Sequence, residues 1–91
     1  MPIKIVIADD HPIFLAGLKE IISYDDDLKI IDTASDGEKA IKIIRKEMPD
    51  VAVLDFDMPE KNAIQVLREF DTENCKTKFI ILTMHKAEDI Y

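Results

Sequence analysis

The stretch that decides the fold, residues 3–12, reads IKIVIADDHP. Its first six residues are rich in β-branched side chains, which favour a strand. Two acidic residues, Asp9 and Asp10, then end the apolar run, and Pro12 is well suited to the first turn of a helix. The stretch therefore predicts a strand, a turn and a helix, with two carboxylates where the strand ends.

A second strand and helix follow along the chain. Residues 28–34 predict a strand, and its charged side chains favour the edge of a sheet. Residues 38–48 carry apolar side chains at helical spacing. Pro49 would end that helix, because the residue before a proline avoids the α-helical conformation. An acidic break at residues 25–27 separates this unit from the first helix.

The second half of the chain contains two uninterrupted apolar runs, residues 51–54 and 79–82. Runs without alternation are typical of strands that are buried on both faces of a parallel sheet. Residues 64–70 have helical spacing and lie between the two runs, and residues 87–91 resemble a first helical turn. Strands that alternate with helices predict a doubly wound α/β fold with a parallel sheet.

Size and charge narrow the classes of protein that remain. The chain has 91 residues, the size of one small domain. It carries 12 Lys and Arg against 19 Asp and Glu, a net charge of −7, so this segment is poorly suited to bind nucleic-acid phosphates. The single cysteine, Cys75, fits a reducing cytoplasm, and the N-terminal apolar run is too short for a membrane span. We therefore expect a cytoplasmic domain with no membrane association.

Polar residues follow three of the predicted strands at the point where each strand ends. Asp9 and Asp10 follow the first strand, Asp55 the third and Thr83 the fourth. The carboxyl ends of parallel strands meet at one edge of the sheet, where doubly wound proteins bind ligands. Carboxylates this close repel one another unless a cation lies among them, and oxygen ligands favour Mg²⁺. Asp55 is then the candidate nucleophile toward a phosphoryl group.

Each of these residues also has a purely structural interpretation. Asp9 and Asp10 could form a turn and an N-cap for the first helix, and Thr83 could hydrogen-bond locally. Asp57 could face solvent or offer its backbone carbonyl to the cation, and we favour the carbonyl. A dehydrated, unpaired carboxylate at the end of a buried strand costs roughly 1–3 kcal/mol, which favours a functional role for Asp55.

Three segments resemble the receiver domain of bacterial response regulators: residues 5–12 (IVIADDHP), 53–59 (VLDFDMP) and 81–85 (ILTMH). The Asp-His-Pro and Thr-Met-His sequences are most similar to receivers of the NarL/LuxR type, which are joined to a C-terminal helix-turn-helix DNA-binding domain. The resemblance implies a flavodoxin-like sheet with strand order 2-1-3-4-5.

The resemblance also implies a role for each acidic residue. Asp55 would accept a phosphoryl group from a phosphohistidine of a sensor histidine kinase. Asp10, Asp55 and the backbone carbonyl of Asp57 would hold Mg²⁺, and Asp9 would act through a metal-bound water. Thr83 would turn toward the phosphoryl group and hydrogen-bond one of its oxygens, which changes the neighbouring surface.

Three nearby residues carry weaker expectations. His85 would face the phosphorylation pocket or lie in an exposed loop, and His11 is expected to be a turn residue. Ala63 stands where relatives usually carry glycine, so a positive φ there would cost roughly 1 kcal/mol.

Residues 1–91 correspond to the N-terminal part of such a receiver, and the receiver is expected to be incomplete in this sequence. The fifth strand, its terminal lysine, the last helices and the DNA-binding output domain are not in these residues. The strand at residues 79–82 would then be an uncovered apolar edge, which favours a homodimer. DNA would be bound only through the output domain.

Two other classes of protein fit part of the pattern. Asp55, Asp57 and the later Thr83 also resemble the first two motifs of haloacid-dehalogenase-type phosphatases, which use an Asp nucleophile and Mg²⁺. Those enzymes usually carry the paired acids after their first strand, and they need a later lysine and acidic pair. A binding-only pseudo-receiver is the second alternative, and the retained acids argue against it. We expect a signalling switch and not an enzyme.

Overall fold

The computed structural model describes residues 2–56, 58–71 and 75–82. Strands alternate with helices as predicted, and each boundary lies within two residues of its expected position. The predictions for Asp57, Thr83, His85 and the helical turn at residues 87–91 fall outside the described residues. In chain order the elements are β1 (Ile3–Ala8), α1 (Pro12–Ser23), β2 (Leu28–Ala34), α2 (Gly37–Glu47), β3 (Val51–Asp55), α3 (Ala63–Asp71) and β4 (Lys78–Leu82).

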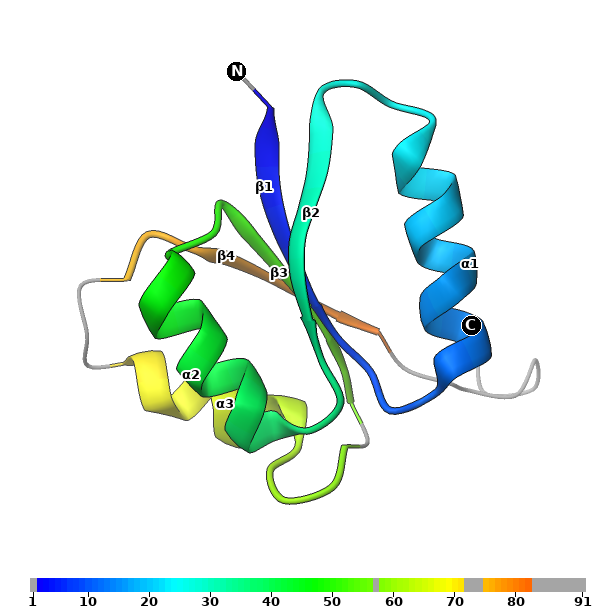
Figure 1. Cartoon of the computed structure of the whole chain (residues 1–91). Helices are drawn as coiled ribbons and strands as arrows, with labels where there is room; N and C mark the ends of the chain where they lie inside the picture. Colours follow the sequence, from blue (N-terminus) through cyan, green and yellow to red (C-terminus); the bar gives the residue numbers. More distant parts are fainter. Residues whose placement is uncertain (1, 57, 72–74, 83–91) are drawn as a thin grey trace, which may run out of the picture.

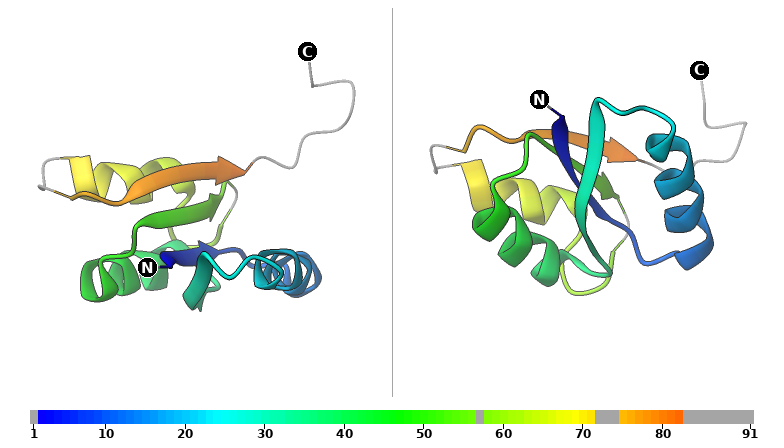
Figure 2. Two further views of the ribbon diagram at one scale, coloured as in Figure 1. Left: turned by 90° about the horizontal axis from the view of Figure 1, so that it is seen from above. Right: turned by 45° about the horizontal axis from the view of Figure 1, so that its top comes forward.

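The strands form one parallel sheet in the order β2-β1-β3-β4. Helix α1 lies on one face of the sheet, and α2 and α3 lie on the other (Figure 1, Figure 2). This arrangement is the doubly wound α/β fold that the sequence predicts, with β2 at the edge of the sheet. The observed order β2-β1-β3-β4 matches the first four strands in the expected order 2-1-3-4-5.

The register of the two central strands decides where the acidic residues lie. β1 pairs with β3 from Ile5 opposite Val51 to Ala8 opposite Leu54. Continuing this register by one residue brings Asp9 next to Asp55, because parallel strands advance together. The carboxylates therefore converge as a direct result of strand pairing.

The edge strand β2 contains an irregularity in its pairing with β1. Ile5 lies opposite Ile30, but the next residue of β1, Val6, lies opposite Asp32. One residue of β2 is therefore extra, as in a β-bulge. Both Ile31 and Ala34 pack against the same hydrophobic cluster, although they are three residues apart.

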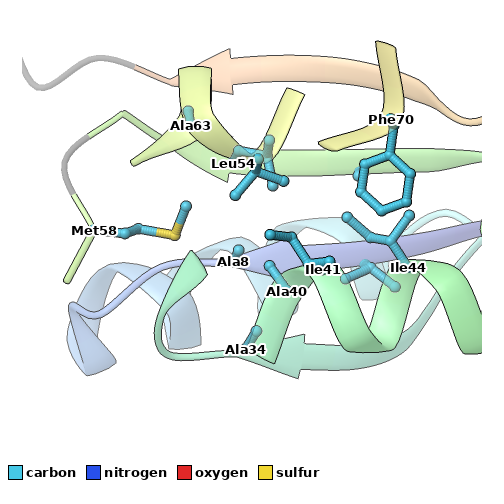
Figure 3. Packing of buried hydrophobic residues seen from close by; sticks show 12 residues of the cluster. Ala8, Ala34, Ala40, Ile41, Ile44, Leu54, Met58, Ala63 and Phe70 are labelled. Atoms are coloured by element: carbon cyan, nitrogen blue, oxygen red, sulfur yellow. The ribbon is translucent and has the colours of Figure 1, made fainter. Parts of the chain in front are cut away.

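The main core lies between the sheet and the two helices α2 and α3 (Figure 3). Ile44 from α2 and Leu54 from β3 are almost completely buried. Phe70 from α3 contacts Phe79 of β4, with ring centroids 5.8 Å apart, and Arg45 lies over the Phe70 ring at 5.3 Å. Such burial stabilises the fold by roughly 1.5–3 kcal/mol for each large side chain.

The prediction that residues 51–54 and 79–82 are buried on both faces is wrong for the described structure. Ala52 and Leu54 are buried toward α2 and α3, but Val51 and Val53 are only half-buried. Ile80, which pairs with Val53, is 50% exposed. On that face α1 packs against β2, so within the described ranges no helix covers β3 and β4.

Helix α2 has clear signals at both ends. The Asp36 side chain accepts a hydrogen bond from the Lys39 backbone N–H at 2.8 Å, as expected for an N-cap. At the other end, Met48 adopts the left-handed conformation with φ of 48° just before Pro49, and its N–H donates to the Ile44 carbonyl. These two residues fix the length of the helix.

The first residue of α2, Gly37, lies directly against the loop that follows β3. Its N–H donates to the Pro59 carbonyl at 3.3 Å. A Cβ atom at this position would lie 2.7 Å from the Lys61 carbonyl carbon and closer still to the carbonyl oxygen. Only glycine therefore allows this approach between the two backbones.

Candidate functional site

Three carboxylates and one imidazole gather at the carboxyl edge of the sheet. They belong to Asp9, Asp10 and His11, which follow β1, and to Asp55, which ends β3. One ligand atom from each of the four side chains lies within 4.8 Å of the other three. The structure therefore brings together the acidic residues that the sequence singled out at the ends of the first and third strands.

The His11 side chain lies in the middle of this cluster. Its Nδ1 is 2.8 Å from Asp9 Oδ1, 3.2 Å from Asp10 Oδ1 and 3.3 Å from Asp55 Oδ2. His11 is also the N-cap residue of α1, with an extended backbone, and its N–H donates to Asp9 Oδ1 at 2.8 Å. The expectation that His11 serves only as a turn residue is incomplete.

The alternative interpretation of Asp9 and Asp10 as N-cap residues of α1 is wrong. The N-cap is His11, and its side chain makes no capping hydrogen bond. Asp9 instead forms a tight local turn with the His11 N–H. Its side chain is buried, while Asp10 remains partly open to solvent.

The buried side chain of Asp9 has one oxygen that needs a partner. Asp9 Oδ2 is buried and accepts no hydrogen bond from any residue that the structure describes. A buried carboxylate oxygen without a partner costs roughly 1–3 kcal/mol. A cation or a cation-bound water near this oxygen would remove that cost.

The acidic neighbours raise the pKa of His11 above its ordinary value of 6.5. The main cause is the hydrogen bond to Asp9; desolvation, the next largest effect, lowers the pKa of His11, and the charges of Asp10, Asp9 and Asp55 raise it. Protonated His11 thus stabilises the fold of the cation-free protein below the unfolded-state pKa. The stabilisation by protonated His11 is lost as the pH rises through the pKa of His11 in the folded protein, which is higher than its pKa in the unfolded chain.

We expect Asp9→Asn to lower the pKa of His11 in the cation-free protein, because the variant removes both the charged acceptor and one nearby negative charge. Titration of the imidazole resonances by nuclear magnetic resonance spectroscopy measures this directly. Asp26→Asn, an exposed residue outside the cluster, is the control and should leave the value unchanged. A His11 pKa that is the same in Asp9→Asn and in the original chain would contradict this electrostatic picture.

The donor atoms of the cluster fit a divalent cation. Three carboxylates in close contact repel one another, and one oxygen of the buried Asp9 has no hydrogen-bond donor among the described residues. Carboxylate oxygens at a partly open edge are the ligands that Mg²⁺ uses when it keeps several waters. Asp9, Asp10 and Asp55 are therefore suited to hold such an ion directly or through its waters.

The strain considered for Ala63 does not arise. Ala63 is the first residue of α3 and is fully buried, and it does not have a positive φ. Among the described residues of the loop after β3, Glu60 has a positive φ, at 69°. The loop is held by the Ala63 N–H, which donates to the Phe56 carbonyl at 3.2 Å, and by the contact with Gly37.

Sequence reasoning missed the positions of His11 and Gly37. His11 directly follows the paired acids, so its place in the chain was a usable signal for a role in the cluster. Gly37 comes soon after the second predicted strand, where a glycine is typical of a turn. No local pattern indicates that its backbone touches a loop more than twenty residues away.

These features define the class of protein: a doubly wound α/β domain with a cluster of acidic residues at the carboxyl edge of its sheet and an aspartate at the end of its third strand. The chain belongs to the response regulator receiver domain family, whose model matches residues 5–91. The described strand order is that of receiver structures.

Curated relatives and a solved structure agree with this family. The chain is 37% identical to the oxygen regulatory protein NreC of Staphylococcus carnosus over 87 residues, covering 94% of this chain and 40% of NreC. It is 33% identical to the transcriptional regulatory protein DegU of Brevibacillus brevis over 86 residues, covering 94% of this chain and 36% of DegU. A DNA-binding response regulator of the LuxR family from Staphylococcus aureus superposes with a TM-score of 0.86 at 28% identity, covering 96% of this chain and 72% of that structure.

The relatives assign this receiver to the NarL/LuxR type, as the sequence predicts. The chain spans about two fifths of the length of these curated relatives. Among the helices that the structure describes, none has the length and apolar character needed to cross a bilayer.

Proposed function

We propose that this chain is a phosphorylation-dependent switch in which Asp55 accepts a phosphoryl group from a sensor histidine kinase. The observation that carries the proposal is the convergence of Asp9, Asp10 and Asp55 at one edge of the sheet. Asp55 is the last residue of a central strand and is buried, so its carboxylate is held rigidly. The phosphodonor would approach from the solvent side, where Asp10 and His11 are exposed.

The proposed transfer is a single displacement at phosphorus. A carboxylate oxygen of Asp55 forms a bond to phosphorus, while the bond from phosphorus to the donor nitrogen breaks and leaves its electron pair on that nitrogen. The donor imidazole then carries a proton from solvent in place of the phosphoryl group. The product is an acyl phosphate on Asp55.

Asp10 and Asp55 would hold Mg²⁺ directly, the Asp57 carbonyl would be a further ligand, and Asp9 would contact it through water. The bound ion would offset the negative charges of the carboxylates and of the incoming phosphoryl group. The Asp9 carboxylate is held in the turn at the end of β1, where it accepts a hydrogen bond from the His11 N–H. Thr83, which follows the last residue of β4, is proposed to donate a hydrogen bond to a phosphoryl oxygen.

Asp10→Asn tests the cation site. We expect it to lower the affinity for Mg²⁺ by about tenfold or more, because a neutral amide replaces a charged oxygen ligand. Isothermal titration calorimetry measures the affinity, and labelling by a small phosphodonor with and without a chelator measures the dependence of the transfer on Mg²⁺. Asp26→Asn is the control for loss of one negative charge. An unchanged Mg²⁺ affinity in Asp10→Asn would reject the assigned ligand.

The remaining parts of the signalling system are proposals drawn from the relatives. We propose that residues 1–91 are the N-terminal part of the receiver and that a helix-turn-helix output domain lies outside this sequence. Relatives bear names such as transcriptional regulatory protein and DNA-binding response regulator, which supports a role in transcription. A sensor histidine kinase and a second copy of the chain are the proposed partners. A regulator of transcription acts where the chromosome lies, so we propose a cytoplasmic location.

A haloacid-dehalogenase-type phosphatase and a binding-only pseudo-receiver are less well supported. In such phosphatases the paired acids usually follow the first strand, whereas Asp55 ends β3 here. A phosphatase would release phosphate over many turnovers, while a receiver takes up one phosphoryl group and hydrolyses only that group. The pseudo-receiver would take up none. We therefore propose that the chain is not an enzyme with an external substrate.

A further inference from the structure

The imidazole of His11 has the position of a ligand in the acidic cluster. Its Nδ1 lies 2.8 Å, 3.2 Å and 3.3 Å from oxygens of Asp9, Asp10 and Asp55. No other described side chain brings a nitrogen into this group of ligand atoms.

These separations resemble those between ligands that share one ion. Two ligand atoms bound at about 2.1 Å lie roughly 3.0 Å apart at octahedral angles and roughly 3.4 Å apart at tetrahedral angles. The distances from Nδ1 to the Asp10 and Asp55 oxygens fall within this range, and the distance to Asp9 is slightly shorter. Small side-chain rotations would suffice to place a common ion among them.

We propose that His11 Nδ1 is a ligand of the cation at this edge, which makes the site a mixed imidazole–carboxylate centre. Imidazole nitrogen binds borderline ions such as Co²⁺ and Zn²⁺ well, whereas Mg²⁺ prefers oxygen ligands and retains its waters. The site therefore binds Co²⁺ more tightly than Mg²⁺, and His11 increases the preference beyond that of the carboxylates alone. This inference rests on the proposed cation site but not on phosphoryl transfer.

Two further observations support a ligand role for His11. The buried Asp9 Oδ2 accepts no hydrogen bond from the described residues, which leaves one oxygen of this carboxylate available to a cation or a cation-bound water. The His11 backbone is fixed, because its N–H donates to Asp9 and its carbonyl accepts from the Leu15 N–H at 2.9 Å. Its side chain is half exposed, which gives an ion a path from solvent.

A competing explanation makes the opposite prediction. If His11 acts only as a positively charged partner of the acids, it competes with every divalent cation. Its removal would then increase the affinity for Co²⁺ and Mg²⁺ alike. A nitrogen ligand, in contrast, selectively favours Co²⁺.

Parallel titrations of the chain with Co²⁺ and Mg²⁺, followed by calorimetry and by the visible absorption of Co²⁺, test the proposal. We expect tighter binding of Co²⁺ in the original chain. In His11→Ala and His11→Gln the Co²⁺ affinity should fall about tenfold or more, the absorption spectrum should change, and the preference for Co²⁺ over Mg²⁺ should become smaller. Asp26→Asn should retain the original affinities, and circular dichroism checks that the variants are folded.

The outcomes separate this inference from the proposed function. An equal or higher Co²⁺ affinity in both His11 variants would overturn the ligand role while leaving the Mg²⁺ site intact. Equal affinities for the two ions in the original chain would do the same. If neither ion bound the original chain, the cation site itself would be wrong, and the inference would fail with it.

Discussion

Asp55→Asn should take up no phosphoryl group from a small phosphodonor in the presence of Mg²⁺, while the original chain is labelled once. The amide oxygen is a far weaker nucleophile than the carboxylate, and the variant also loses one of the charges proposed to hold the cation. Intact-mass spectrometry detects the added group, and peptide mapping locates it. The expected effect is a loss of labelling to the background level.

The matched control is Asp26→Asn, which changes the same chemistry at an exposed acid away from the cluster. It should be labelled like the original chain. Because Asp55 is buried beside two other acids, its replacement is not expected to unfold the domain, and chemical denaturation can verify this. Full labelling of a folded Asp55→Asn variant would reject Asp55 as the acceptor.

Gly37→Ala should lower the free energy of unfolding by about 3 kcal/mol, because a methyl group at this position overlaps the Lys61 backbone. The new Cβ atom would overlap main-chain atoms of Lys61, so a side-chain rotation cannot relieve the clash. The loop after β3 must move away, and this loop is continuous with Asp55. We therefore also expect weaker Mg²⁺ binding. Urea denaturation and calorimetry measure the two effects.

The other glycine of the chain provides the matched control. Gly17 lies on the exposed side of α1, and a Cβ atom there would have no neighbour within 4 Å. Gly17→Ala should stabilise the protein by roughly 0.5–1 kcal/mol, because alanine loses less conformational entropy in a helix. Equal stability changes for the two substitutions would show that the approach of Gly37 to Lys61 does not restrict this position.

The topology could be predicted from the sequence because the local signals for strands, turns and helices agreed with one another along the chain. The run of residues 3–8 ends at two acids, and Pro49 and Asp36 mark the ends of α2. Burial was predicted less well. An apolar run such as residues 79–82 indicates a preference for burial. The extent of burial depends on which elements cover each face of the sheet. Within the described ranges no helix covers Ile80, so the apolar pattern alone overstated its burial.

In the site, too, some features follow from the local sequence and others depend on tertiary packing. The sequence indicates where the strands end, so the closeness of Asp9, Asp10 and Asp55 could be predicted. The position of the His11 ring depends on the turn geometry at the start of α1, which residue types alone do not specify. The backbone contact of Gly37 with Lys61 depends on tertiary packing. The positive φ at Glu60 could not be located either, because the residue types in such a loop do not determine which one reverses the chain.

The extra residue in β2 limits how the length of this strand can change. Edge strands often accept insertions and deletions, since only one neighbour must adjust. Here the pairing with β1 is offset between its two halves, so that Ile31 and Ala34 both face the core. Deleting one residue at the offset would restore even pairing and keep both halves of the strand in their present orientation, because Ile30 and Ala34 pair with Ile5 and Ala8, which are three residues apart in β1. A deletion elsewhere in β2 would instead turn the residues on one side of it to the opposite face of the sheet. This edge strand is therefore expected to lose a residue most readily at the offset.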